Sequence, residues 1–90
     1  MVSRTVPVTN ALGLHARAAA RFVHTASTFA SRVRVTRDGR EMDGKSILGL
    51  LLLSASHGSV ITISTEGADE QQALDTLVRL AEEGFGEPCA

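Results

Sequence analysis

The chain has 90 residues, with nine lysines and arginines against ten aspartates and glutamates and a formal net charge of -1. This length supports one small hydrophobic core, so we expect residues 1–90 to form a single domain. The balanced charge and the lack of Trp and Tyr argue against binding to nucleic acid or an anionic membrane, because neither an overall positive field nor a base-stacking platform is available.

Cysteine use and hydropathy indicate the compartment. Cys89 is the single cysteine, so it cannot form an internal disulfide, and no metal-ligand spacing surrounds it. The first residues lack the apolar stretch of a signal peptide, and the longest apolar run, Leu50–Leu53, is too short to span a bilayer. We therefore expect a soluble protein of the reducing cytoplasm, without a membrane segment, metal or cofactor.

The first predicted element is a strand over residues 2–8, in which Val2, Val6 and Val8 share one face. Pro7 lacks a backbone donor and therefore favours, weakly, an edge position in the sheet. A loop over residues 9–14 follows, and Gly13 permits a tight turn near its end.

An alanine-rich stretch next predicts a helix from Ala16 to about Ala26, with His15 at its N-terminus. Its inward apolar stripe is expected to continue past the helix and comprises Ala19, Phe22, Val23, Ala26, Phe29 and Ala30. Arg17, Arg21 and His24 are four and three residues apart, which places them in a basic row on an outer flank.

A hairpin is predicted over residues 33–42, because Asp38-Gly39 suits a two-residue type I′ turn between alternating stretches. Ser46 then precedes a short helix over residues 47–53 that is apolar nearly all round. Such a helix cannot bury every side chain. We expect Leu50 and Leu53 in the core and the others at a partner surface.

The last two elements are a β-branched strand over residues 60–64 and a helix that Asp69 and Gln72 are predicted to cap as a pair. The inner face of this helix comprises Ala73, Leu74, Leu77, Val78 and Ala81. Gly84 is expected to end it, and residues 85–90 to form a loose tail.

These elements give the order βαββαβα, an α+β fold with helices on one face of a four-stranded antiparallel sheet. The pattern admits two topologies. A ferredoxin-like sheet would put the first strand in the middle, whereas the order 1-4-2-3 would leave it at an edge, as Pro7 favours.

His15 stands where chemistry is most expected. Unpaired N–H groups at a helix start, here beginning with Ala16, and the positive end of the helix dipole attract an anion, and phosphate is the natural candidate. A neutral imidazole is a nucleophile for phosphorus, and Arg17 would pair with the oxygens of the product. An isolated Gly-x-His is more often a surface histidine that only caps a helix.

The stretches GLHARAAARFV, GKSILGLLLL, SVITISTEG and DEQQALDTLVRL together resemble the HPr family of the bacterial phosphoenolpyruvate-dependent sugar phosphotransferase system. The resemblance implies an open-faced sandwich with strand order 1-4-2-3. It also implies that His15 accepts phosphate on a ring nitrogen from enzyme I and passes it to IIA domains of sugar permeases, with Arg17 pairing the phosphate. Ala18 departs from the family, which usually has proline after this arginine.

Ser46 is the second candidate site. It caps the short helix, and the residues that follow it resemble the HPr subgroup in which HPr kinase/phosphorylase phosphorylates this serine. A phosphate there would place about two negative charges beside the expected partner surface and weaken docking. That surface comprises Ile47, Leu48, Leu51 and Leu52, with Arg17, Arg21, His24 and Lys45 at its rim.

Two other functions compete with a monomeric phosphocarrier that is not itself an enzyme. A regulatory binding module would use the phosphorylation state of Ser46 to control docking to enzymes or transcription factors, outside sugar transport. A stand-alone hydrolase is disfavoured, because no second acid, base or metal set accompanies His15.

Overall fold

A computed structural model describes residues 1–87 of the chain. Its strands are β1 (Val2–Pro7), β2 (Arg32–Arg37), β3 (Arg40–Asp43) and β4 (Val60–Glu66). Its helices are α1 (Ala16–Ala26), α2 (Ile47–Leu52) and α3 (Glu70–Glu82), followed by a 3₁₀ turn, η1 (Gly84–Gly86). None of the helices within these residues is long and apolar enough to cross a membrane.

The four strands form one antiparallel sheet in the order β1-β4-β2-β3, which confirms the predicted 1-4-2-3 arrangement. Pro7 pairs with Val60 at the end of the edge strand β1, where its missing N–H breaks no interior ladder. Asp38 and Gly39 have φ values of 50° and 80°, as the predicted type I′ turn between β2 and β3 requires.

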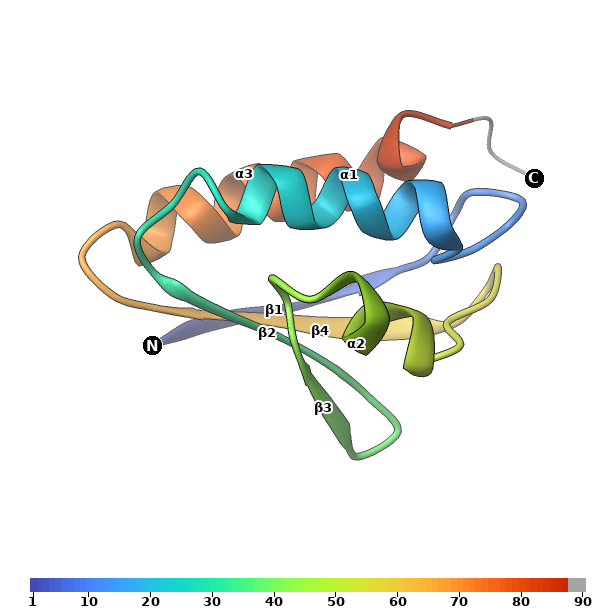
Figure 1. Cartoon of the computed structure of the whole chain (residues 1–90), viewed down its shortest axis with the longest axis horizontal. Coiled ribbons are helices and arrows are strands. Elements are labelled where there is room, and N and C mark those ends of the chain that lie inside the picture. The colour runs from blue at the N-terminus through green and yellow to red at the C-terminus, as the bar shows by residue number, and fades with distance from the viewer. Residues whose placement is uncertain (88–90) are drawn as a thin grey trace.

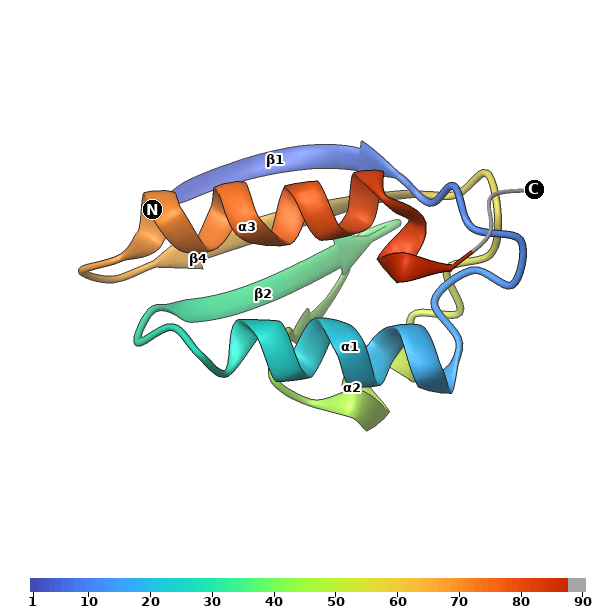
Figure 2. The same ribbon diagram turned by 90° about the horizontal axis from the view of Figure 1, so that it is seen from above.

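The helices cover one face of the sheet, so the fold is an open-faced sandwich. Figures 1 and 2 show α1 and α3 side by side along the sheet, with α2 packed beside α1. Phe22 of α1 and Leu77 of α3 are fully buried against Val35 and Ile63 of the central strands. The opposite face is polar, as in the contact between Thr5 Oγ1 and Thr62 Oγ1 at 2.9 Å.

The predicted extension of the α1 stripe is wrong, because the helix ends at Ala26, Phe29 is only half-buried and Ala30 is exposed. The Asp69 carboxylate explains why the chain does not continue as a helix toward β2. It accepts hydrogen bonds from the N–H groups of Ala30 and Ser31, each at 2.9 Å, and from the Ser31 hydroxyl, which fixes this segment as a loop.

The predicted capping pair of Asp69 and Gln72 is also wrong. Asp69 does precede α3, but its side chain makes no cap bond because the loop before β2 engages both carboxylate oxygens. Glu70, the first residue of α3, instead accepts from the N–H of Gly67 in the preceding turn at 3.1 Å. The hydrogen bond from the Ser31 hydroxyl is the main reason that the pKa of Asp69 lies below its usual 3.8.

The loose tail predicted from residue 85 onward is wrong as far as Glu87. Gly84 ends α3 with a φ of 67°, as expected, but Phe85 then turns back into the core and is fully buried. Its ring meets that of Phe22 edge-on, with centroids 6.5 Å apart. The remainder of the predicted tail, residues 88–90, lies outside the described residues.

Candidate functional site

His15 is the N-cap of α1, as the sequence predicts, and has an extended backbone with φ of -81° and ψ of -178°. The loop before it is held against the segment after α2, where the Leu14 N–H donates to the Ala55 carbonyl at 2.8 Å. Gly13 makes this approach possible, because its φ is 67° and a Cβ there would lie 2.5 Å from the Ala55 oxygen. The fold therefore presents His15 at an open helix end.

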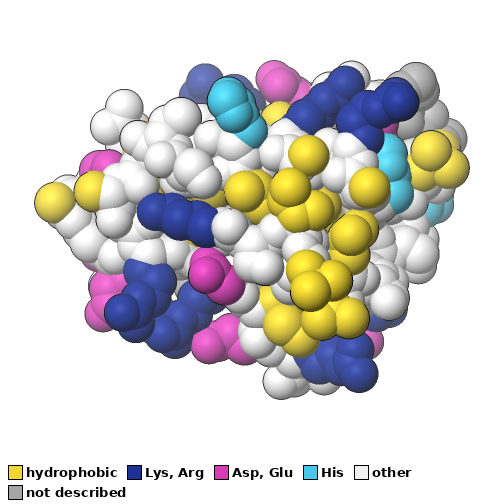
Figure 3. Space-filling model, in the orientation of Figure 1, with side chains coloured by type: hydrophobic (Ala, Val, Ile, Leu, Met, Phe, Trp, Pro, Cys, Tyr) yellow, Lys and Arg dark blue, Asp and Glu magenta, His cyan; other side chains and the backbone are white. Residues whose placement is uncertain are grey.

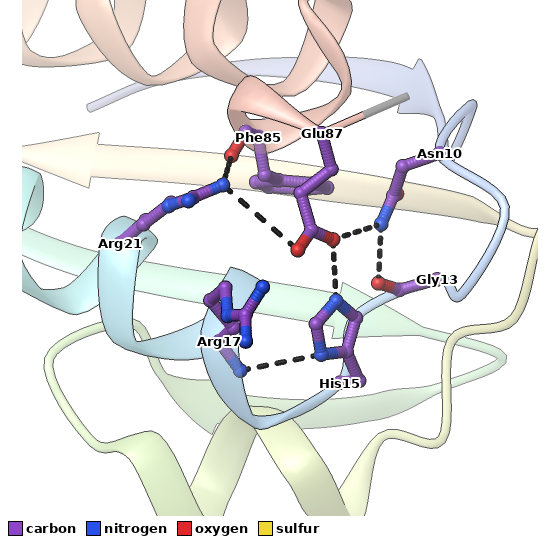
Figure 4. Close-up of polar contacts among 7 residues, drawn as sticks. All are labelled: Asn10, Gly13, His15, Arg17, Arg21, Phe85 and Glu87. Atoms are coloured by element: carbon purple, nitrogen blue, oxygen red, sulfur yellow. Dashed lines mark hydrogen bonds and ion pairs between the residues drawn. The ribbon is translucent and has the colours of Figure 1, made fainter. Parts of the chain in front are cut away.

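The two ring nitrogens of His15 have different partners (Figure 4). Nδ1 accepts from the backbone N–H of Arg17 at 3.3 Å, while Nε2 is hydrogen-bonded to Oε1 of Glu87. Since an N–H points at Nδ1, the neutral ring carries its proton on Nε2 and donates it to the carboxylate. The lone pair that remains on Nδ1 faces the start of α1.

Glu87 was not among the residues singled out from the sequence, yet it lies at the centre of this cluster. Its carboxylate also accepts from Asn10 Nδ2 at 3.2 Å and lies 3.9 Å from the Arg21 guanidinium. The hydrogen bond from His15 is the main reason that the pKa of Glu87 lies below its usual 4.5, and burial opposes this shift. The one available signal was Phe85, a large apolar residue among the mostly small residues of the predicted tail.

The two arginines of the predicted basic row have different surroundings. The exposed Arg17 guanidinium has no hydrogen-bond or ion-pair partner within residues 1–87. Arg21 donates to the Phe85 carbonyl at 2.8 Å and is partly committed to holding the tail. Both line one groove with His24, Leu80 and Phe85, so the predicted basic residues do lie together on the flank of α1.

Ala16 is the first residue of α1, and its N–H makes no hydrogen bond within the part of the chain that the structure describes. Together with the free guanidinium of Arg17, it leaves donors available around the face of Nδ1. A negatively charged group of three oxygens attached to Nδ1 would meet these donors, and such charge-assisted bonds contribute about 1.5–3 kcal/mol each.

Ser46 caps α2 as predicted, since its Oγ accepts from the Gly49 N–H at 3.0 Å. Leu50 and Leu53 are buried, as predicted, whereas Leu51 is half-buried and packs on the core. The exposed fractions of the remaining apolar residues of α2 are 43% for Ile47, 67% for Leu48 and 51% for Leu52. The exposed apolar patch of α2 therefore comprises Ile47, Leu48 and Leu52.

Basic side chains border part of this patch, and Figure 3 shows hydrophobic atoms with Lys and Arg side chains at their margins. Lys45 lies next to the patch in sequence, but its Nζ donates to the Phe29 carbonyl at 2.8 Å. Arg40 reaches it from β3 and donates to the Leu52 carbonyl at 3.0 Å. His57 lies in the exposed loop before β4.

Comparison with known proteins places the chain in a family. A family profile described as "PTS HPr component phosphorylation site" matches residues 2–83. The phosphocarrier protein HPr of Cupriavidus necator is 46% identical over 87 residues, which cover 97% of this chain and 98% of that protein.

Solved structures agree with this comparison. The crystal structure of HPr from Thermoanaerobacter tengcongensis superposes with a TM-score of 0.94 at 45% identity, and covers 98% of this chain and 99% of that one. The crystal structure of Crh, a catabolite repression protein of Bacillus subtilis, has a TM-score of 0.76 at 42% identity over 93% of this chain and 97% of that one, and is a domain-swapped dimer.

Proposed function

We propose, because the chain belongs to the HPr family of phosphocarrier proteins, that it accepts its phosphoryl group on His15 and passes it to a second protein. The observation that carries the proposal is the orientation of the ring. Nδ1 offers its lone pair at the start of α1, within 3.3 Å of the Arg17 N–H and near its unpaired guanidinium.

In the proposed reaction the lone pair of Nδ1 attacks the phosphorus atom of a phosphorylated donor protein. The N–P bond forms as the bond from phosphorus to the donor breaks, and the donor keeps that electron pair. The N–H groups of Ala16 and Arg17 and the Arg17 guanidinium then pair with the phosphoryl oxygens. They hold the group without a further covalent bond, so a second nucleophile can remove it.

The proposed donor is enzyme I, and the proposed acceptors are IIA domains of sugar permeases. The exposed apolar patch of α2 and the basic groove along α1 support this, since α2 packs beside α1 and the two surfaces together suit an acidic partner with an apolar centre. We further propose that residues 1–90 act as one cytoplasmic domain and as a monomeric shuttle that is not a stand-alone enzyme. Size-exclusion chromatography with light scattering would test the monomer against a Crh-like dimer.

Labelling with phosphoenolpyruvate and enzyme I tests the phosphocarrier site. The wild-type chain should acquire one acid-labile phosphate, and His15→Ala should acquire none. His57→Ala is the control, because this histidine is exposed in the loop before β4, outside the proposed docking surface. Undiminished labelling of the His15 variant would refute the proposal.

We also propose that phosphorylation of Ser46 regulates docking, through HPr kinase/phosphorylase. Ser46 is only half-buried, and it lies at the N-terminus of α2 beside Ile47 and Leu48. A phosphate there is compatible with the helix dipole and adds about two negative charges next to the exposed apolar patch. Acidic partners would then be repelled.

Incubation with ATP and HPr kinase/phosphorylase tests this second site. The label should disappear in Ser46→Ala and persist in Ser27→Ala, whose serine is exposed at the end of α1. If ATP labels Ser46 while enzyme I never labels His15, the result would support the alternative function, a regulatory module like Crh. No labelling of Ser46 would exclude its regulation by this kinase.

A further inference from the structure

The segment after α3 carries a carboxylate to His15 across 72 residues of sequence. Three contacts fix its course. Phe85 is fully buried against Phe22, its carbonyl accepts from Arg21 at 2.8 Å, and the N–H of Glu87 donates to the Gly84 carbonyl at 3.0 Å. Glu87 therefore extends from an anchored turn.

The Glu87 side chain is held on several sides. Only 11% of it is exposed, compared with 26% of the His15 side chain. Asn10, itself fully buried, donates to Oε1 at 3.2 Å and to the Gly13 carbonyl at 2.7 Å, so one amide links the carboxylate to the loop that precedes His15. Figure 4 shows the carboxylate between Asn10, His15 and Arg21.

We infer that Glu87 is a positioning residue for phosphoryl transfer, which holds the His15 ring through Nε2–H so that the lone pair of Nδ1 faces the start of α1. The inference rests on the proposed phosphocarrier function. The carboxylate acts through the ring, because it contacts Nε2 and not the nitrogen that we propose to bond phosphorus.

The carboxylate also bears on the charge that the reaction creates. When Nδ1 attacks phosphorus, its lone pair becomes the N–P bond and positive charge develops on the ring, while the proton stays on Nε2. A carboxylate bonded to that N–H stabilises the charge, as an aspartate does for the histidine of a serine-protease triad. When the phosphoryl group leaves, the N–P electron pair returns to Nδ1 and the ring regains the same neutral tautomer.

Two substitutions of Glu87 separate its hydrogen bond from its charge. Glu87→Ala removes both, while Glu87→Gln keeps an oxygen that can accept from Nε2–H. The matched control is Glu83→Gln, an exposed carboxylate at the end of α3 whose side chain makes no hydrogen bond or ion pair within residues 1–87. Phosphorylation by enzyme I is measured at saturating and limiting concentrations, and ¹⁵N NMR of the unphosphorylated ring reports its tautomer.

We expect Glu87→Ala to lower the maximal rate by about 10- to 100-fold, by analogy with the loss of a carboxylate that orients a metal-binding histidine. The KM for enzyme I should not change, and the ring signals should move from those of the Nε2–H tautomer toward a mixture. Glu87→Gln should lower the maximal rate by less, and Glu83→Gln should leave it unchanged. Thermal unfolding of each variant checks that it is folded.

The inference is overturned if Glu87→Ala is phosphorylated at the wild-type rate, or if Glu83→Gln lowers the rate as much as Glu87→Ala does. It is also overturned if Glu87→Ala lowers the rate while the His15 ring signals stay unchanged. These outcomes differ from failure of the proposed function. In that case the wild-type chain itself would carry no phosphate on His15.

Discussion

At the scale of single residues, two arginines on the same face of α1, Arg17 and Arg21, have different roles. Within residues 1–87 the Arg17 guanidinium has no hydrogen-bond or ion-pair partner, whereas Arg21 binds the Phe85 carbonyl and lies near the Glu87 carboxylate. Sequence spacing places both on one flank but does not distinguish them, because Phe85, the hydrogen-bond partner of Arg21, lies 64 residues further along the chain.

Alanine substitutions of the two arginines should therefore affect different properties, the phosphorylation rate for Arg17 and the stability for Arg21. Arg17→Ala should slow phosphorylation by enzyme I about 10- to 100-fold, the equivalent of one charge-assisted hydrogen bond, and change the free energy of unfolding by less than about 0.5 kcal/mol. Arg21→Ala should cost about 1–2 kcal/mol of stability, because the Phe85 carbonyl loses its donor. Urea denaturation and labelling rates measure the two effects. A larger stability loss for Arg17→Ala would contradict this division.

Ala18 is the residue at which this chain departs from the usual family pattern. It is fully buried in the first turn of α1, where proline is tolerated because helix N–H groups there lack backbone acceptors. Alanine thus keeps the helix, and the observed geometry of His15 at its N-terminus does not require proline at position 18.

At the scale of elements, α2 is a helix of six residues with one side-chain cap. Ser46→Ala should lower the free energy of unfolding by about 1 kcal/mol, because the Gly49 N–H loses its acceptor. Ser46→Asp keeps an acceptor and adds a favourable charge at the helix start, so its stability should match the wild type. The same aspartate should weaken binding to enzyme I. Denaturation and binding titrations separate the effects, and equal destabilisation by both substitutions would argue against the cap.

Asp69 joins two elements, since its carboxylate holds the loop between α1 and β2 at the start of α3. Its pKa is lowered in the folded state, chiefly by the Ser31 hydroxyl. An acid with a lowered folded pKa stabilises the fold above its unfolded value, here 3.8, and loses that contribution as the pH falls through the lower folded value.

The stability difference between wild type and Asp69→Asn should therefore be constant near neutral pH and shrink below about pH 4. Asp75→Asn is the control, because Asp75 lies on the same helix and accepts only from Gln71, one turn away. Denaturation midpoints at several pH values measure the difference. A gap that widens as the pH falls would contradict the expected sign.

At the scale of the whole molecule, local patterns account for most of the architecture. The alternation in β2, the Asp38-Gly39 turn and the alanine-rich run after His15 each act over a few residues, and each element lies where these patterns predict it. The failures share a physical cause. Asp69 and Glu87 bind groups 38 and 72 residues away, so only the assembled fold selects these partners over local ones.

The tail is the part of the molecule that completes this assembly. The Phe85 ring is fully buried and meets Phe22 edge-on, although Phe85 adopts a φ of 57° that costs a non-glycine residue energy. Packing must outweigh that strain, and the ring closes the core between α1 and α3.

Phe85→Ala should therefore reduce the free energy of unfolding by about 3–5 kcal/mol, a large share of the 5–15 kcal/mol typical of a domain. Phe29→Ala is the matched control, because it removes the same type of side chain from a half-buried position in the loop after α1. It should reduce the free energy of unfolding by less. The Phe85 variant should also release Glu87, so the His15 ring signals should change in it and not in the Phe29 variant. Urea denaturation and ¹⁵N NMR test both consequences, and an equal loss in the two variants would show that the tail does not close the core.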